Sequence, residues 1–249
     1  MLGEIWVNVA SGLAGGFIVW LLQRCWNLGK LLPLALKCNN RNKRIRVSVS
    51  YLIRVKVGEK FLLVKGEKIN QWQPVGGVYK TFKDTESALS DLSVKYDDES
   101  TPHRPGCERD LRINLPRRNI IKFIRWFESG KEREVGPWRE FYEELIETNI
   151  LPQKEFHFIF ARFIRRHRTP IHYSPHFNQD EILIADIYEL VPTEGQCAEL
   201  NRLSSIKDSQ QFILLKLESL KRYGFDKETR TSLAIPLSET VGWTIQDLI

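Results

Sequence analysis

Hydrophobic and polar positions divide the chain into an apolar N-terminal segment and a longer region of mixed periodicity. Residues 5–22 read IWVNVASGLAGGFIVWLL and carry no charged side chain. At about 1.5 Å per residue, a helix of this length nearly crosses a hydrocarbon core of about 30 Å. Trp6 and Trp20 lie near its ends, where aromatic rings favour the membrane interface. The pattern predicts a transmembrane anchor, with a buried helix of a soluble protein as the alternative.

The charges around this segment predict its orientation. Only Glu4 precedes it, whereas residues 24–46 are rich in Lys and Arg. A cleaved signal peptide would carry its positive charge before the apolar run. Positive charge marks the cytoplasmic side, so we predict a single pass through the cell inner membrane with the N-terminus outside. The expected organisation is an anchor over 1–26, an interfacial basic linker touching membrane lipid over 27–46, and a cytoplasmic domain over 47–249.

Small residues recur within the predicted anchor. Gly12 and Gly16 have the spacing that lets two membrane helices approach closely. We therefore expect a homo-oligomer assembled through these glycines. The alternative is that glycine is simply common in membrane helices.

Beyond the linker, strand and helix patterns predict an α/β fold, in the form of an α+β sandwich. Alternating β-branched residues over 44–57 and the run KFLLVKGE over 60–67, joined at Gly58, indicate a β-hairpin. The segment NIIKFIRWFESG is typical of an amphipathic helix that ends at Gly130. Further strands are expected over 155–164 and 181–190, a helix over 138–147, and a C-terminal helix over 210–224.

Two motifs in this region carry candidate chemistry. Gly76 and Gly77 follow a strand in NQWQPVGGVYK and would let the main chain approach a ligand. In WREFYEELIE, Glu140, Glu143 and Glu144 share one side of a helix, with Glu147 one turn further on. Several carboxylates on one rigid element suit a hard divalent cation. The alternative is an ordinary solvated helix face.

Composition shows an excess of positive charge and argues against a zinc site or a disulfide framework. The formal net charge is +6 and the pI about 9.1, which suits an anionic partner such as a nucleotide, a nucleic acid or a membrane surface. Arg165, Arg166 and Arg168 are expected in a loop where they could hold phosphates, unless that loop is only a solvated turn. The four cysteines show no spacing typical of a zinc site or a disulfide framework.

A hairpin, a Trp-x-Pro-x-Gly-Gly turn and a helix with Arg-Glu-x-x-Glu-Glu together resemble the Nudix family. The family's Arg-Glu-apolar-x-Glu-Glu core is matched by the residues Arg139, Glu140, Phe141, Glu143 and Glu144. The resemblance implies a Nudix-like fold in which these glutamates bind Mg²⁺ or Mn²⁺ and one can serve as a general base.

The chain also departs from the family pattern. A long insertion, about 81–130, separates the glycine pair from Arg139. Lys131 stands where the family has its first glutamate, with Glu132 one place away. The box is therefore split and partly degenerate, which leaves open whether hydrolysis is retained.

With its anchor, the DLRINLP segment leading to WFESG, and REFYEEL, the chain resembles SMODS-associating NUDIX domains carried behind transmembrane helices. That resemblance implies an effector of bacterial cyclic-oligonucleotide antiphage signalling. Its domain would sense a cyclic nucleotide made by a nucleotidyltransferase, and its membrane segment would disrupt the inner membrane and kill the infected cell. No direct DNA binding is expected. The alternatives are a membrane-tethered, Mg²⁺-dependent Nudix hydrolase of a nucleoside diphosphate derivative and an adaptor with an inactive Nudix fold.

Overall fold

The computed structural model describes residues 42–66, 70–97, 109–206, 208–224 and 235–249. The predicted anchor, with Gly12 and Gly16, lies outside these residues, as does most of the predicted linker. Across the part of the chain that is described, no helix has both the length and the apolar character needed to cross a membrane.

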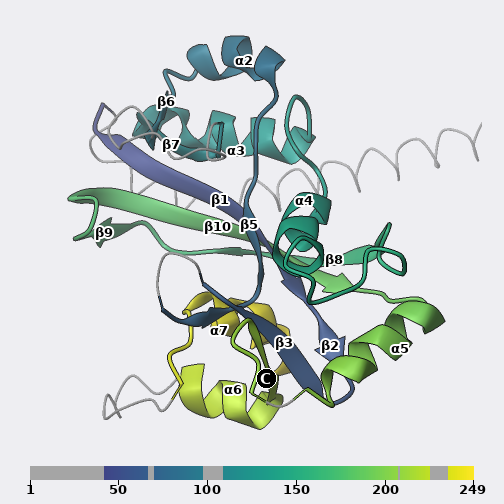
Figure 1. Ribbon diagram of the computed structural model, residues 1–249. Coiled ribbons are helices and arrows are strands. Elements are labelled where there is room, and N and C mark those ends of the chain that lie inside the picture. Colours follow the sequence, from purple (N-terminus) through teal and green to yellow (C-terminus); the bar gives the residue numbers. More distant parts are fainter. Residues whose placement is uncertain (1–41, 67–69, 98–108, 207, 225–234) are drawn as a thin grey trace, which may run out of the picture.

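A mixed seven-stranded sheet forms the centre of the described region (Figure 1). Its strands run in the order β6-β7-β1-β10-β8, and β5 and β9 pair with β1 and β10. The bounds are β6 Lys95–Tyr96, β7 Arg112–Pro116, β1 Arg44–Arg54, β10 Gln179–Leu190, β8 Ala161–Arg168, β5 Val75–Val78 and β9 His172–Ser174. β1 runs parallel to β10 and antiparallel to β7 and β5. Buried on both faces, β1 is the core strand of the fold.

β7 and β5 lie end to end along the same edge of β1. Ser48 pairs with Arg112 of β7, and Ser50 pairs with Val78 of β5. Between these pairs, Val49 accepts a hydrogen bond from Tyr79 and donates one to Leu111. The inserted segment is thereby joined to the strand that carries the glycine pair.

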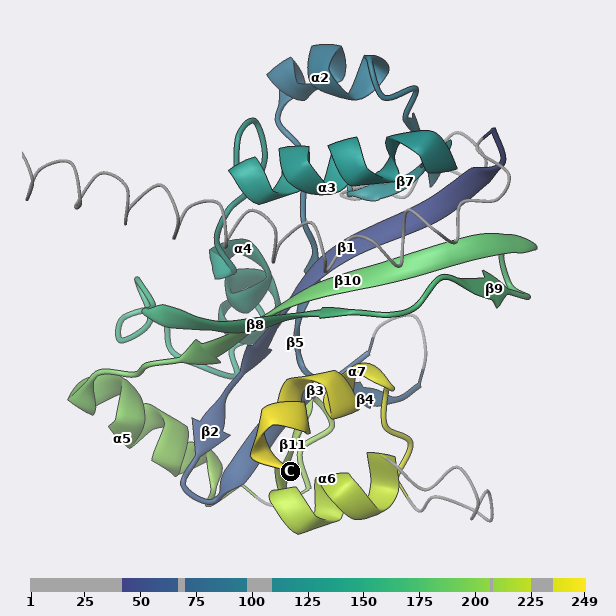
Figure 2. The same cartoon turned by 180° about the vertical axis from the view of Figure 1, so that it is seen from behind.

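A smaller four-stranded sheet packs below the first. It comprises β11 Phe212–Lys216, β3 Lys60–Lys65, β2 Lys56–Val57 and β4 Trp72–Gln73. Two helices, α6 Leu217–Gly224 and α7 Thr240–Ile245, lie together beside β3 and β11 (Figure 2). Phe61 and Leu63 of β3 pack there against Leu220, Val241 and Ile245.

The remaining helices cover the main sheet and its far end. α3 Ile120–Ser129 lies over β1 and β7, and α2 Glu86–Ser90 lies beyond it at the top of the view (Figure 1). The buried residues of α3 are spaced as the helical period predicts: Ile120, Phe123, Ile124 and Phe127. Gly130 ends α3 in the left-handed conformation that favours glycine. α5 Glu194–Leu203 begins with a capping box made by Thr193 and Gln196.

Several elements differ from those predicted, and tertiary packing explains each difference. Only β2 forms the expected hairpin with β3, because β1 belongs to the main sheet. Residues 212–216 form β11 because they pair with β3, so the predicted helix begins only at Leu217. The strand predicted over 155–164 begins only at Ala161, and it continues as β8 along β10 through 165–168, which were predicted to be a loop. The insertion also contributes a core strand, because Leu111, Ile113 and Leu115 are fully buried.

Candidate functional site

The two halves of the split motif meet where α4 Trp138–Phe141 packs against β5. The backbone N–H of Gly76 donates to Glu144 Oε2 at 2.8 Å. Gln73 Nε2 lies 3.4 Å from the other oxygen of Glu144. The insertion therefore lengthens the chain between the halves without separating them in space.

Both glycines stand at close approaches, to the main chain at Gly76 and to a side chain at Gly77. Gly76 has φ +142°, and a Cβ there would lie 2.2 Å from the carbonyl oxygen of Tyr51. A Cβ on Gly77 would lie 2.0 Å from Glu140 Oε1. Any other residue at 77 would displace the Glu140 carboxylate. The close approaches seen here are to Tyr51 and Glu140 of the chain itself, and the predicted approach to a ligand stays a prediction.

Arg139 gathers the acidic side chains on one side of the site. Its Nη1 donates to Glu140 Oε1 at 2.7 Å and to Glu143 Oε2 at 3.1 Å. Its Nη2 donates to the Val78 carbonyl at 2.8 Å and to Glu134 Oε2 at 3.1 Å. This guanidinium fixes the helix carboxylates against β5.

Glu134 is one of the site residues that the sequence reasoning missed. It pairs with Arg139 and accepts a hydrogen bond from the Tyr51 hydroxyl at 3.1 Å. Lys131 and Glu132, the positions expected from the family spacing, are both exposed. The reason is local: Thr81 pairs with Arg133 in an isolated bridge, which brings Glu134 to the backbone of Lys80 at 3.2 Å. The sequence signal that could have identified Glu134 is its place two residues before Gly136-Pro137, where the acidic helix begins.

The helix itself changes winding inside the motif. Tyr142–Ile146 form a π-helical turn directly after α4, and the N–H of Glu147 bonds to the Tyr142 carbonyl at 3.0 Å. Such turns are rare and recur at functional sites. Glu147 follows this turn, is exposed, and does not line the cavity described below. The prediction that all four glutamates lie in one acidic stripe is therefore wrong for Glu147.

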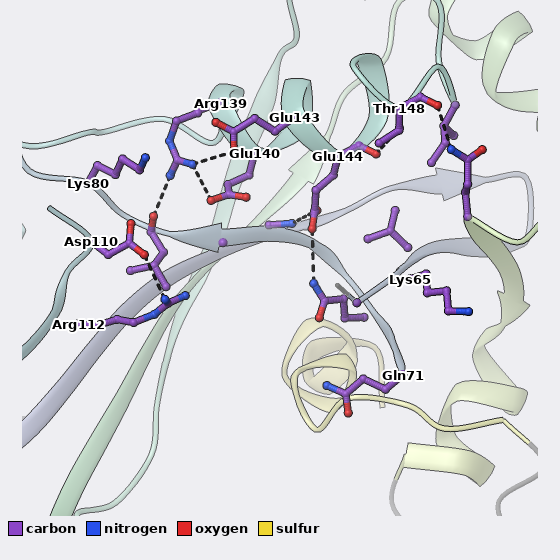
Figure 3. A pocket seen from close by; sticks show the side chains of 18 of the residues that line it. Lys65, Gln71, Lys80, Asp110, Arg112, Arg139, Glu140, Glu143, Glu144 and Thr148 are labelled. Carbon is purple, nitrogen blue, oxygen red and sulfur yellow. Dashed lines mark hydrogen bonds and ion pairs between the residues drawn. The ribbon is translucent and has the colours of Figure 1, made fainter. Parts of the chain in front are cut away.

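The predicted metal ligands do not converge in this arrangement. Glu140 and Glu143 turn toward Arg139, while Glu144 turns toward Gly76 (Figure 3). Within the described ranges, no three His, Cys, Asp or Glu side chains are placed to hold one ion. Burial raises the pKa of the Glu140 carboxyl, and Arg139 opposes that shift only in part. As placed, these residues do not fit a shared Mg²⁺ or Mn²⁺ ion.

A cavity of about 790 Å³ opens beside this network. Its size is within the range of small-molecule sites. Its wall includes Gly76 and Gly77. Its charged and amide side chains are Asp110, Glu140, Glu143 and Glu144; Lys65, Lys80, Arg112 and Arg139; and Gln71, Gln73, Gln210 and Gln211. The cavity thus offers charges of both signs together with amide donors and acceptors.

Two of the wall residues come from the insertion. Asp110 pairs with Arg112 at 3.2 Å between Oδ2 and Nη1. Burial raises the pKa of Asp110 to about 6, although Arg112 and Lys80 oppose the shift. The insertion therefore supplies part of the cavity wall as well as part of the sheet.

The arginines predicted to bind phosphate lie elsewhere. Arg165, Arg166 and Arg168 are on β8, and none lines the cavity. Arg166 pairs with the buried Asp186 at 2.6 Å, and Arg165 donates to the carbonyl of Trp243. The structure does not bring this group to the glycine pair or to the acidic helix.

Comparison with known proteins identifies a family. No curated protein matches the chain at a significant level. Residues 44–239 match the family described as the SMODS-associated NUDIX domain. That match covers most of the chain and contains both halves of the split motif. The chain therefore belongs to the SMODS-associated NUDIX domain family.

Proposed function

We propose that this protein is the effector of a bacterial cyclic-oligonucleotide antiphage system. Its Nudix-like domain binds a cyclic nucleotide made by a nucleotidyltransferase, and its N-terminal segment then disrupts the inner membrane, so that the infected cell dies. The observation that carries this proposal is the cavity of about 790 Å³ at the junction of the split motif. Family membership adds the association with SMODS systems.

The contacts that the motif's glutamates make favour ligand sensing over ligand hydrolysis. Arg139 engages Glu140 and Glu143, and Gly76 engages Glu144, so the helix carboxylates act here as structural links. The walls of the cavity meanwhile carry Lys65 and Arg112, which suit an anionic ligand. A sensor needs only these binding groups.

The alternative is a Mg²⁺-dependent Nudix hydrolase, because Glu140, Glu143 and Glu144 all line the cavity. In that case the three carboxylates would leave their present partners to hold the ion. The two functions can coexist if the domain also degrades its signal.

One experiment separates them. The full chain is titrated with a panel of cyclic di- and trinucleotides in EDTA and in Mg²⁺, and each ligand is recovered and analysed by chromatography. A sensor binds in both buffers and returns the ligand intact. A hydrolase consumes ligand only with Mg²⁺, and Glu143→Gln with Glu144→Gln abolishes that turnover while leaving binding. Absence of binding to every member of the panel would refute the sensor proposal.

The membrane step is a proposal drawn from residues 5–22. We expect cells that make the protein and its nucleotide signal to take up a membrane-impermeant dye, and cells with residues 1–26 deleted to exclude it. Gly12→Ile together with Gly16→Ile should weaken self-association in a cross-linking assay. Dye uptake that persists in the deletion variant would contradict the proposed anchor.

A further inference from the structure

The cationic groups of the cavity lie at two ends. Arg112 and Lys80 are on one side of Glu144, while Lys65 and Gln71 are on the other (Figure 3). Arg139 lies on the same side as Arg112 and Lys80, and its guanidinium is bound to three carboxylates (Figure 3). The wall therefore has two cationic ends separated by an acidic middle.

The acidic middle determines where an anion can bind. Glu140, Glu143 and Glu144 all border the central part of the wall. A phosphate placed there would face like charges at short range, which is unfavourable, especially where water is excluded. Anionic groups of a ligand are therefore favoured at the ends of the cavity.

Each end also has polar partners of its own. Arg112 begins β7 and lines the cavity, and its Nη1 is 3.2 Å from the buried Asp110, which holds the guanidinium in place. At the other end, the backbone N–H of Lys65 donates to the Gln211 carbonyl at 3.0 Å, and Gly66 donates to the Gln71 carbonyl at 2.8 Å. The side-chain amides there suit the donor and acceptor pattern of a base edge.

We infer that the cavity selects ligands with two phosphodiester groups held apart on one ring, with Arg112 contacting one phosphate and Lys65 the other. This inference rests on the proposed sensor function and names the ligand class of that site. It makes Arg112, which the insertion contributes, a specificity-determining residue. On this inference a mononucleotide, with a single phosphate, contacts only one of the two cations.

The test is a double-mutant cycle on the full chain with Arg112→Gln and Lys65→Gln. The probes are the cyclic dinucleotide that binds best in the panel and its two mononucleotide halves. Each single variant should raise the Kd for the cyclic dinucleotide about tenfold, as expected for one lost charge-assisted hydrogen bond. Either mononucleotide should bind more weakly and respond to only one of the two substitutions.

Three controls make the result specific. Arg125→Gln removes the same charge from an exposed position of α3 outside the cavity and should leave the Kd unchanged. Arg112→Lys should retain part of the affinity because it keeps the charge. Thermal midpoints of Lys65→Gln and Arg125→Gln should stay close to that of the wild type. Binding by Arg112→Gln is measured well below its own midpoint, because this substitution removes the partner of the buried Asp110.

The outcomes separate this inference from the function on which it rests. If the wild type binds a cyclic dinucleotide but both substitutions leave the Kd unchanged, Arg112 and Lys65 do not contact its phosphates. The inference is then refuted, while the proposed sensor function is retained. If a mononucleotide binds as tightly as the cyclic dinucleotide, selection for two phosphates is refuted. If the wild type binds no cyclic nucleotide, both the proposed function and this inference are refuted.

Discussion

The backbone N–H of Gly76 donates to the carboxylate of Glu144 at 2.8 Å, across 68 positions of sequence. One hydrogen bond thus connects the strand and the helix that a continuous motif would join through a short loop. The insertion between them passes along the edge of β1 and returns through Glu134 to Arg139. The split motif is one structural unit, and its ion pairs can be tested singly.

Gly77→Ala should be destabilising, because the added Cβ displaces the Glu140 carboxylate from Arg139. Its Cβ would lie 2.0 Å from Glu140 Oε1, so either the carboxylate or the strand must move. We expect a loss on the order of 2 kcal/mol in the free energy of unfolding, measured by chemical denaturation. The matched control is Gly195→Ala, where nothing lies within 4 Å and alanine favours the helix. Equal stability of the two variants would show that Glu140 does not contact β5.

Glu134→Gln tests the residue that closes the network on Arg139. It removes one carboxylate from a part-buried guanidinium and weakens the bond to Tyr51, so the expected loss is roughly 1–3 kcal/mol. Glu132→Gln is the control, because Glu132 is exposed and its side chain is outside the network. Its effect should stay within about 0.5 kcal/mol. If Glu132→Gln were the more damaging substitution, the family spacing would be right and the observed pairing wrong.

Asp110→Asn should change the pH dependence of stability. Burial raises the pKa of Asp110 in the folded state to about 6, so the folded protein binds a proton that the unfolded chain has already released. Ionised Asp110 therefore opposes folding above pH 6, and this penalty fades as the pH falls below 6. At pH 7.5 the variant should be more stable than the wild type by roughly 1–3 kcal/mol.

The same comparison at lower pH provides the check. As the pH falls from 7.5 to 5, the difference between variant and wild type should narrow, because Asp110 becomes neutral in the wild type. Thermal denaturation at several pH values measures it directly. A difference that stays constant over this range would mean that the carboxyl titrates with an ordinary pKa.

Local patterns predicted much of this fold because the responsible interactions are local. The buried stripe of α3 and its end at Gly130 follow from helical period and glycine conformation. The Arg139 helix was likewise placed by its own residues, although the π-helical turn at Tyr142–Ile146 was not foreseen. The strands were harder, because β11 forms only through its pairing with β3.

In the candidate site, the residues that belong to local motifs were predicted, whereas those brought in by long-range pairing were not. Gly76, Gly77 and the three glutamates were found from motif spacing, and all line one cavity. Glu134, Asp110 and Arg112 reach the site only through the path of the insertion along β1, which no local pattern encodes. Charge density alone singled out the arginines of β8, which are instead engaged in the main sheet and α7.

The central claim, that a cyclic nucleotide binds in this cavity, is tested most directly by calorimetric titration of the wild type beside Thr148→Trp. Thr148 is exposed and lines the cavity, so a tryptophan there would fill the space without disturbing the core. Thr148→Ser is the control that leaves the cavity open. The account predicts that the wild type and Thr148→Ser bind a cyclic di- or trinucleotide and that Thr148→Trp, folded to the same thermal midpoint, does not. Equal binding by all three proteins, or binding by none, would contradict it.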